Sequence, residues 1–141
     1  MTAIEPDDVA RLRAVIGRLS RKLNASVADV GFSPSQLSVL GSIARRGPLG
    51  VGELAELEGI NPTMLSRIVG KLHDADLIAR IADPDDGRAV VVQVTSAGRK
   101  LHQRVQALRS KALADQLANI PADQTAELMA ALPALEALAA R

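Results

Sequence analysis

The 141-residue chain contains no cysteine, and Phe32 is its only aromatic residue. Without cysteine, disulfides, thiolate metal sites and a thiol redox switch are excluded. With one aromatic ring, stacking on bases or ligands is nearly excluded, and the core must consist of Leu, Val, Ile and Ala. No apolar run approaches the roughly 18 residues of a membrane span, and no basic, then apolar, leader opens the chain. We expect a cytoplasmic protein without membrane contact.

The charges are balanced overall but unevenly distributed. Hydrophobic residues make up 48% of the chain and charged residues 23%, with a net charge of +1, which is ordinary for one globular domain. Residues 9–28 and 87–114 nevertheless contain several Lys and Arg and no acid. Such tracts are either solvated helix faces or the contact surface for a polyanion, and composition leaves both open.

Apolar spacing and capping residues predict a mainly helical fold. Val9, Leu12, Ile16 and Leu19 begin a stripe of helical spacing that runs to Gly31. The predicted helices cover residues 6–30, 34–46, 51–58, a segment from Pro62, 96–119, and 122–140 with an interruption at Pro133. Ser33 and Asn61 are the expected N-caps. Residues 49–51 are long enough only for a connector or a brief strand.

Residues 77–82 and 89–95 alternate as strands of a hairpin, and the loop between them is rich in aspartate. A calcium loop is a poor interpretation, because Asp83, Asp85 and Asp86 have the wrong spacing and no glutamate closes the loop. A turn is the simpler interpretation, in which Pro84 fixes φ and Gly87 supplies a positive φ. Neither explains Arg88, the one cation in the loop.

The segment GELAELEGINPTMLSRIVGKL, residues 52–72, has the spacing of a helix-turn-helix. On a helical wheel, its second helix places apolar residues on one side, namely Leu65, Ile68, Val69 and Leu72. The opposite side is polar and small, as a helix that enters a major groove requires. An ordinary solvated helix face gives the same pattern, so this segment alone does not decide.

Residues 49–101, and above all the Asp86-Gly87-Arg88 tripeptide followed by alternating valines and Thr95, resemble the MarR family of bacterial winged helix-turn-helix regulators. The resemblance implies a wing whose arginine enters the minor groove and is braced by the aspartate. It also implies a dimer formed by the first and last helices. The implied DNA contacts are Asn61, Pro62, Thr63, Met64, Ser66, Arg67, Gly70 and Lys71 in the recognition helix, and Asp86, Gly87 and Arg88 in the wing. The implied dimer contacts are Val9, Leu12, Ile16, Leu19, Leu128, Leu132, Leu135 and Leu138.

The expected architecture is one domain, 1–141, with a winged helix-turn-helix lobe at 34–95 and dimerisation helices at 1–30 and 96–141. The expected function is a nucleoid-associated, homodimeric repressor that binds double-stranded DNA at a pseudo-palindromic operator and is released by a small molecule. No cofactor or metal is expected, and the ligand residues are not identified. The alternative is a winged-helix module that binds proteins and not DNA.

Departures from the family pattern and the enzyme alternative bear on these expectations. Family members often have an acid at the position of Gly70, and Pro133 interrupts a helix that is usually continuous. An enzyme is not expected, because His73 and His102 lie on predicted polar helix faces with no nucleophile or acid spaced to be activated by them. Glu53, Glu56 and Glu58 likewise form a predicted surface row.

Overall fold

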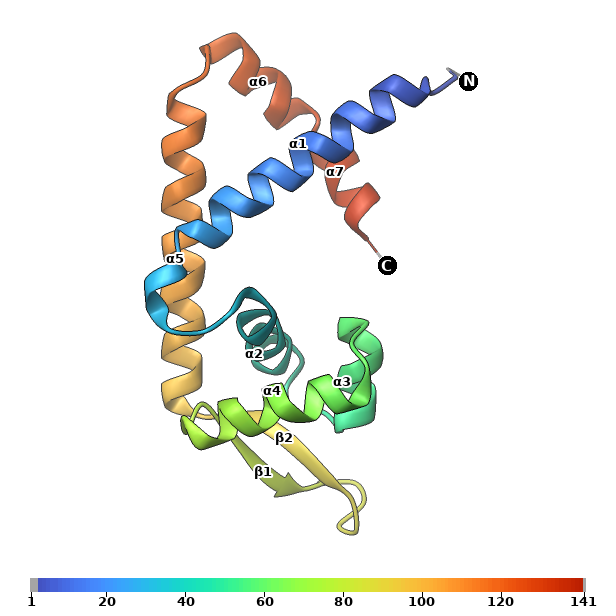
Figure 1. Ribbon diagram of the computed structural model, residues 1–141, viewed down its shortest axis with the longest axis vertical. Helices are drawn as coiled ribbons and strands as arrows, with labels where there is room; N and C mark the ends of the chain where they lie inside the picture. Colours follow the sequence, from blue (N-terminus) through green and yellow to red (C-terminus); the bar gives the residue numbers. More distant parts are fainter. Residues whose placement is uncertain (1–2, 141) are drawn as a thin grey trace.

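The computed structural model describes residues 3–140 and confirms the mainly helical fold class with a hairpin wing (Figure 1). The elements are α1 (Pro6–Ala25), a 3-10 turn (Ala28–Val30), α2 (Pro34–Arg46), α3 (Val51–Glu58), α4 (Pro62–Asp74), β1 (Ile78–Ala82), β2 (Val90–Val94), α5 (Ser96–Ala118), α6 (Ala122–Ala130) and α7 (Leu132–Ala139). α5 runs along one side of the molecule. A lobe of α2, α3, α4 and the hairpin packs at its N-terminal end, and α1, α6 and α7 extend from its other half (Figure 1).

Side-chain caps begin α2 and α4 at the predicted residues. The Ser33 hydroxyl accepts a hydrogen bond from the Gln36 amide at 3.2 Å, and the Gln36 side chain accepts one from the Ser33 amide at 2.8 Å, which forms a capping box. The Asn61 side chain accepts from the Met64 amide at 2.8 Å. Pro34 and Pro62 follow their caps at the start of each helix, where a missing N–H costs nothing.

Left-handed residues end α3 and follow α4. Gly59 has a φ of 64° and lets the chain turn from α3 into α4 within three residues. Asp76 has a φ of 60°, and the next amide, of Leu77, donates to the Leu72 carbonyl at 3.0 Å. Aspartate tolerates this conformation better than most residues. These two turns bring α4 against both α3 and β1.

The core of the lobe joins every one of its elements. It consists of Val39, Leu40, Ile43, Leu54, Ala55, Leu65, Ile68, Val69, Leu72, Leu77, Ile78 and Val92. The four residues predicted for the inner face of α4 are all among them. Burying each Leu or Ile stabilises the fold by roughly 1.5–3 kcal/mol, so α4 is firmly held and its opposite face is left outward.

The hairpin is shorter than predicted and is tied to the loop before α3. β1 and β2 pair antiparallel from Ile78 opposite Val94 to Ala82 opposite Val90, so β1 begins one residue later than predicted and β2 is one residue shorter at each end. Leu49 forms an isolated bridge with Val92, in which each amide donates to the other carbonyl, at 3.0 and 2.8 Å. Of the two possibilities for residues 49–51, a connector or a brief strand, the structure has a connector with one bridging residue.

A glycine permits the close approach of α5 to the start of β1. The Thr95 hydroxyl caps α5 by accepting from the Gly98 amide at 3.1 Å, and it donates to the Asp76 carbonyl at 2.7 Å. A Cβ at Gly98 would lie 2.0 Å from the carbonyl oxygen of Leu77. Only glycine fits there without movement of the backbone.

The terminal helices differ from prediction in their ends. α1 stops at Ala25 and not at residue 30, because Ser26 bonds back to the Leu23 carbonyl and a 3-10 turn follows. Pro133 ends the preceding helix at Ala130 and begins α7, as its missing N–H requires. Within residues 3–140, no helix is long and apolar enough to cross a membrane.

Candidate nucleic-acid interface

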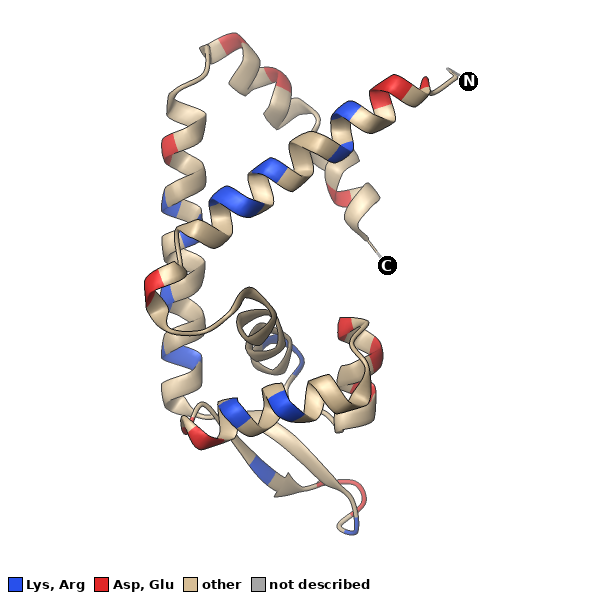
Figure 2. Cartoon of the chain, viewed as in Figure 1, with Lys and Arg blue, Asp and Glu red and all other residues tan. Residues whose placement is uncertain are grey.

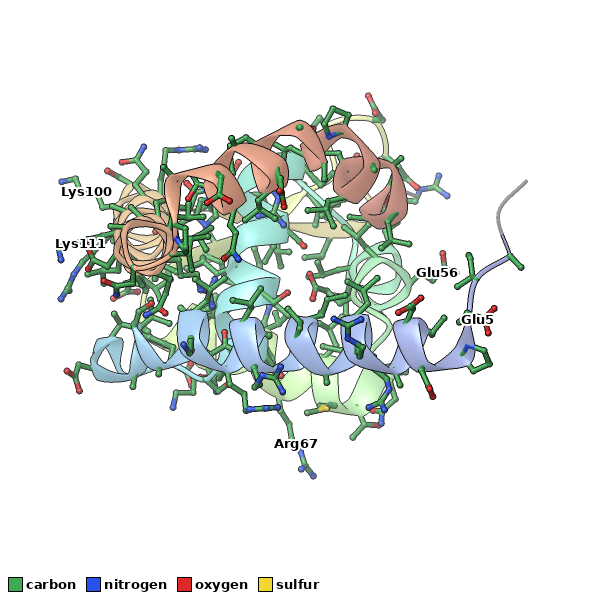
Figure 3. All side chains as sticks on the ribbon, turned by 90° about the horizontal axis from the view of Figure 1, so that it is seen from above. Glu5, Glu56, Arg67, Lys100 and Lys111 are labelled. Atoms are coloured by element: carbon green, nitrogen blue, oxygen red, sulfur yellow. The ribbon has the colours of Figure 1, made fainter. Side chains whose placement is uncertain are left out.

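The outward face of α4 is polar at its N-terminal end. Thr63, Met64, Ser66 and Arg67 are exposed, and Asn61 precedes them as the cap. Arg67 projects away from the body (Figure 3). Its guanidinium forms no ion pair within residues 3–140. The first two turns therefore present hydroxyls, a thioether and an unpaired cation near the positive end of the helix dipole, a combination suited to base edges and phosphates.

The second half of the α4 face is less uniform. Gly70 lies where a Cβ would meet nothing within 4 Å, so the helix surface there is flat and open. The Lys71 ammonium lies 5.8 Å from the centre of the Phe32 ring, a cation–π contact with the body of the protein. Lys71 is thus partly engaged by its own chain, whereas Arg67 is not.

The wing loop is shaped by its aspartates. The Asp83 carboxylate accepts from the Asp85 amide at 2.9 Å, and the Asp86 carboxylate accepts from the Arg88 amide at 3.1 Å. The Ala89 amide donates to the Asp86 carbonyl at 3.0 Å, which closes a β-turn with Gly87 and Arg88 at its centre. Arg88 therefore occupies the tip of the turn.

Two expectations for this loop are corrected. Gly87 is not among the residues with positive φ, since a turn of ordinary φ closed by aspartate side chains needs no left-handed residue. Asp86 holds the backbone of Arg88 and not its guanidinium, because the carboxylate is already turned toward the Arg88 amide. The arginine side chain itself is unpaired within residues 3–140.

The two candidate DNA-reading elements share one end of the molecule. α4 and the hairpin lie at the end of α5 opposite α6 (Figure 1), with basic positions along α4 and at the tip of the wing, and acidic ones on α3 (Figure 2). Arg80 on β1 is also exposed, and sequence reasoning did not single it out. Its place in a strand of alternating pattern could have indicated that it faces solvent.

The residues predicted for dimerisation form exposed apolar surface. Their exposed fractions lie between 37% for Leu135 and 65% for Leu138. Within residues 121–140, every residue but Thr125 is exposed, so α6 and α7 bury almost nothing against their own chain. Further exposed apolar residues are Ile4, Val15, Leu113, Ile120 and Met129. Exposed apolar side chains in such number on the terminal helices are typical of an interaction surface.

An open cleft of about 910 Å³ lies between α1, α2 and α5, above the lobe. Ser20 and Asn24 from α1, Arg45 from α2, and His102 and Arg109 from α5 supply polar groups to its walls. The Arg109 guanidinium donates to the Asn24 amide oxygen at 3.2 Å, which ties α5 to α1. No spacing pattern in the sequence indicates this cleft, since its residues come from three distant segments.

His102 and Glu58 are not the solvated residues that the sequence suggested. His102 is half-buried and lies against Gly41 of α2, where a Cβ would come within 3.3 Å of its ring. Burial lowers the pKa of His102 below its ordinary value of 6.5, and the guanidiniums of Arg45, Arg99 and Arg109 lower it further. Glu58 is half-buried, whereas Glu53 and Glu56 are exposed as predicted.

Comparison with known proteins agrees with this geometry. A sequence model of the MarR family matches residues 32–90. An HTH-type transcriptional regulator of Mycobacterium bovis is 34% identical over 109 residues, covering 77% of this chain and 76% of the relative. The HTH-type transcriptional repressor MdtR of Bacillus subtilis is 29% identical over 106 residues, covering 75% and 68%. The crystal structure of RV1404 from Mycobacterium tuberculosis superimposes with a TM-score of 0.85 at 26% identity, covering 97% and 96%.

These relatives are transcriptional regulators, which removes the enzyme alternative. The residues matched by the family model, 32–90, include the exposed polar face of α4 and the wing with Arg88. The chain therefore belongs to the MarR family of winged helix-turn-helix, DNA-binding transcriptional regulators.

Proposed function

We propose that the protein is a homodimeric repressor that binds a pseudo-palindromic operator. The observation that carries this proposal is the pairing, at one end of the molecule, of the polar α4 face with the Arg88 wing tip. In the proposed complex, Thr63, Met64, Ser66 and Arg67 read the major groove and Arg88 enters the adjacent minor groove. A narrow minor groove attracts arginine because of its enhanced negative potential. A relative named as a repressor supports the direction of regulation.

Selection from a random DNA library at low salt, followed by footprinting, tests this function. We expect two half-sites separated by about 10 base pairs, one helical turn, because a two-fold dimer presents its recognition helices at that spacing. A protein-binding module, the alternative, would enrich no sequence and would bind random DNA only weakly. A footprint that covers one unrepeated half-site would contradict the dimeric arrangement.

Replacement of Arg88 by alanine is expected to weaken operator binding by about 1–3 kcal/mol and to reduce the salt dependence. The fold should be unaffected, because Arg88 is exposed and its side chain is unpaired within residues 3–140. Asp86→Ala should have a smaller effect of the same kind, by freeing the Arg88 backbone. Fluorescence anisotropy at two salt concentrations measures both.

Lys111→Ala is the matched control for this loss of one positive charge. Lys111 is exposed on α5, forms its one ion pair within residues 3–140 with Asp115, and points away from the lobe (Figure 3). Its loss should alter binding only through net charge. If Arg88→Ala and Lys111→Ala bind the operator equally well, the loop is a turn without a role in the minor groove.

We infer that the cleft takes a small aromatic acid that releases the DNA. Arg45 and Arg109 supply positive groups, and Ile16 and Leu19 add an apolar wall. Benzoate should displace operator DNA, whereas benzyl alcohol, of similar shape but uncharged, should not. If both compounds displace DNA equally, the carboxylate is not recognised by the cleft. If neither displaces DNA, a small aromatic acid is not the effector.

The lowered pKa of His102 predicts a pH dependence of folding. An unfolded chain binds the proton more readily than the folded one, so the free energy of unfolding falls as the pH drops below about 6.5, the unfolded pKa. In His102→Gln, the free energy of unfolding should therefore fall less between pH 7 and pH 5 than it does in the wild type. Urea unfolding at both pH values measures it. The same slope in wild type and His102→Gln would show that the loss arises elsewhere.

A further inference from the structure

Glu58 is held by two serines of a neighbouring helix. The Ser38 hydroxyl donates to one carboxylate oxygen, Oε2, at 2.8 Å, and the Ser42 hydroxyl donates to the other, Oε1. Ser38 and Ser42 are four residues apart on α2 and so lie on one face of that helix. Ser42 is 4% exposed, the one buried polar side chain of the described residues. We call this arrangement the Glu58 clasp.

The position of Glu58 is electrostatically unfavourable without the serines. It is the last residue of α3, whose final turn contains no basic residue, and it faces the negative end of the helix dipole. Arg45 and Arg46 line the same small polar cavity, of about 310 Å³, as Glu58. Neither is within ion-pair distance of it among the described residues. The two serine hydroxyls are therefore its direct partners.

The clasp acts on the start of the recognition helix. Only Gly59 and Ile60 separate Glu58 from Asn61, the cap of α4. The Ile60 amide donates to the Ala55 carbonyl at 3.2 Å, so the connection is short and ordered. Apolar contacts between α2, α3 and α4 are non-directional and allow small sliding movements. Two hydrogen bonds to one carboxylate are directional and fix the position of this corner on α2.

Glu58 and Ser38 also line the large cleft between α1, α2 and α5. The carboxylate is therefore shared between the wall of the cleft and the corner that carries α4. We propose that Glu58 is a positioning residue for DNA recognition, which fixes the N-terminus of α4 on α2 through Ser38 and Ser42. This inference rests on the proposed role of α4 in reading DNA.

The test compares operator binding and amide hydrogen exchange in full-length variants. Ser38→Ala with Ser42→Ala should lower operator affinity about tenfold or more and speed exchange at residues 59–64, with no change in α5. Glu58→Gln should stay within about threefold of wild type, because its amide accepts one hydrogen bond and donates the other. Ser35→Ala is the matched control, a cleft-lining serine of α2 that does not contact Glu58.

Each outcome separates the clasp from the proposed function. Wild-type protein that selects no DNA sequence overturns the reading role of α4, and the clasp with it. Wild-type protein that binds its operator while the double serine variant binds equally well overturns the clasp alone. Equal losses in Ser35→Ala and Ser38→Ala also overturn it. If the double variant fails to fold, Ser38→Ala decides, because Ser38 is exposed and its loss does not disturb the core.

Discussion

Gly98→Ala is expected to destabilise the fold by about 3 kcal/mol, since it forces a methyl group into a packed backbone contact. The added Cβ would lie 2.0 Å from the Leu77 carbonyl oxygen and 2.9 Å from a methyl carbon of Val94. A backbone oxygen cannot move aside as a flexible side chain does. Either α5 shifts away from the hairpin, or the Thr95 cap and the Leu77 turn are lost.

Thermal unfolding at fixed protein concentration measures this change, with an expected fall in Tm of about 10 °C for a chain of this size. Gly52→Ala is the control, since Gly52 lies in α3 and a Cβ there would meet nothing within 4 Å. That variant should be stabilised by up to about 1 kcal/mol, the difference in helix propensity. A Gly98→Ala protein as stable as wild type would show that the α5–β1 contact is easily relaxed.

Leu12→Glu combined with Ile16→Glu is expected to convert the proposed dimer into a monomer and to weaken operator binding by more than about 100-fold. Both side chains are at least 44% exposed on α1, so within one chain they contribute little to the core. In the proposed dimer they are buried, and two unpaired carboxylates there cannot be accommodated. A monomer can also contact only one of the two half-sites, and the loss of simultaneous binding alone lowers the affinity by a factor of about 100 or more.

Sedimentation equilibrium and operator titration test this expectation together. Arg18→Glu is the control, because it adds negative charge to α1 on a different face of the helix from Leu12 and Ile16. It should leave the dimer intact. A double-glutamate variant that stays dimeric and keeps its operator affinity would place the interface elsewhere on the chain. A monomer that still binds DNA tightly would remove the two-fold operator from the proposal.

Local signals in the sequence predicted most of the fold. Ser33 with Pro34, and Asn61 with Pro62, specify helix starts from neighbouring residues, and the structure has both. The inner face of α4 follows from helical spacing in the same way. The end of α1 was misplaced because Val27 continues the apolar spacing, and it is indeed buried. It lies in a turn between the end of α1 and the 3-10 turn, which spacing alone does not distinguish from a continuing helix.

Features that depend on distant partners were not predictable from the sequence. Glu58 reads as a surface acid because its serine partners lie 16 and 20 residues earlier. His102 reads as solvated because nothing local indicates that Gly41 makes room for its ring. The Arg88 backbone contact was missed for a different reason. The Asp86 carboxylate was expected to hold the Arg88 guanidinium, whereas it accepts a hydrogen bond from the backbone amide of Arg88.

The 23 residues of α5 give the molecule a lever arm. At about 1.5 Å per residue, its length is roughly 35 Å, close to one turn of duplex DNA. One end of the arm joins the proposed partner-binding helices, and the other is fixed to the hairpin by Thr95 and Gly98. A rotation of about 5° at the first end would therefore displace the wing by roughly 3 Å. That displacement is comparable with the rise of one base pair, so a small angular change far from the DNA suffices to put a wing out of register with its groove.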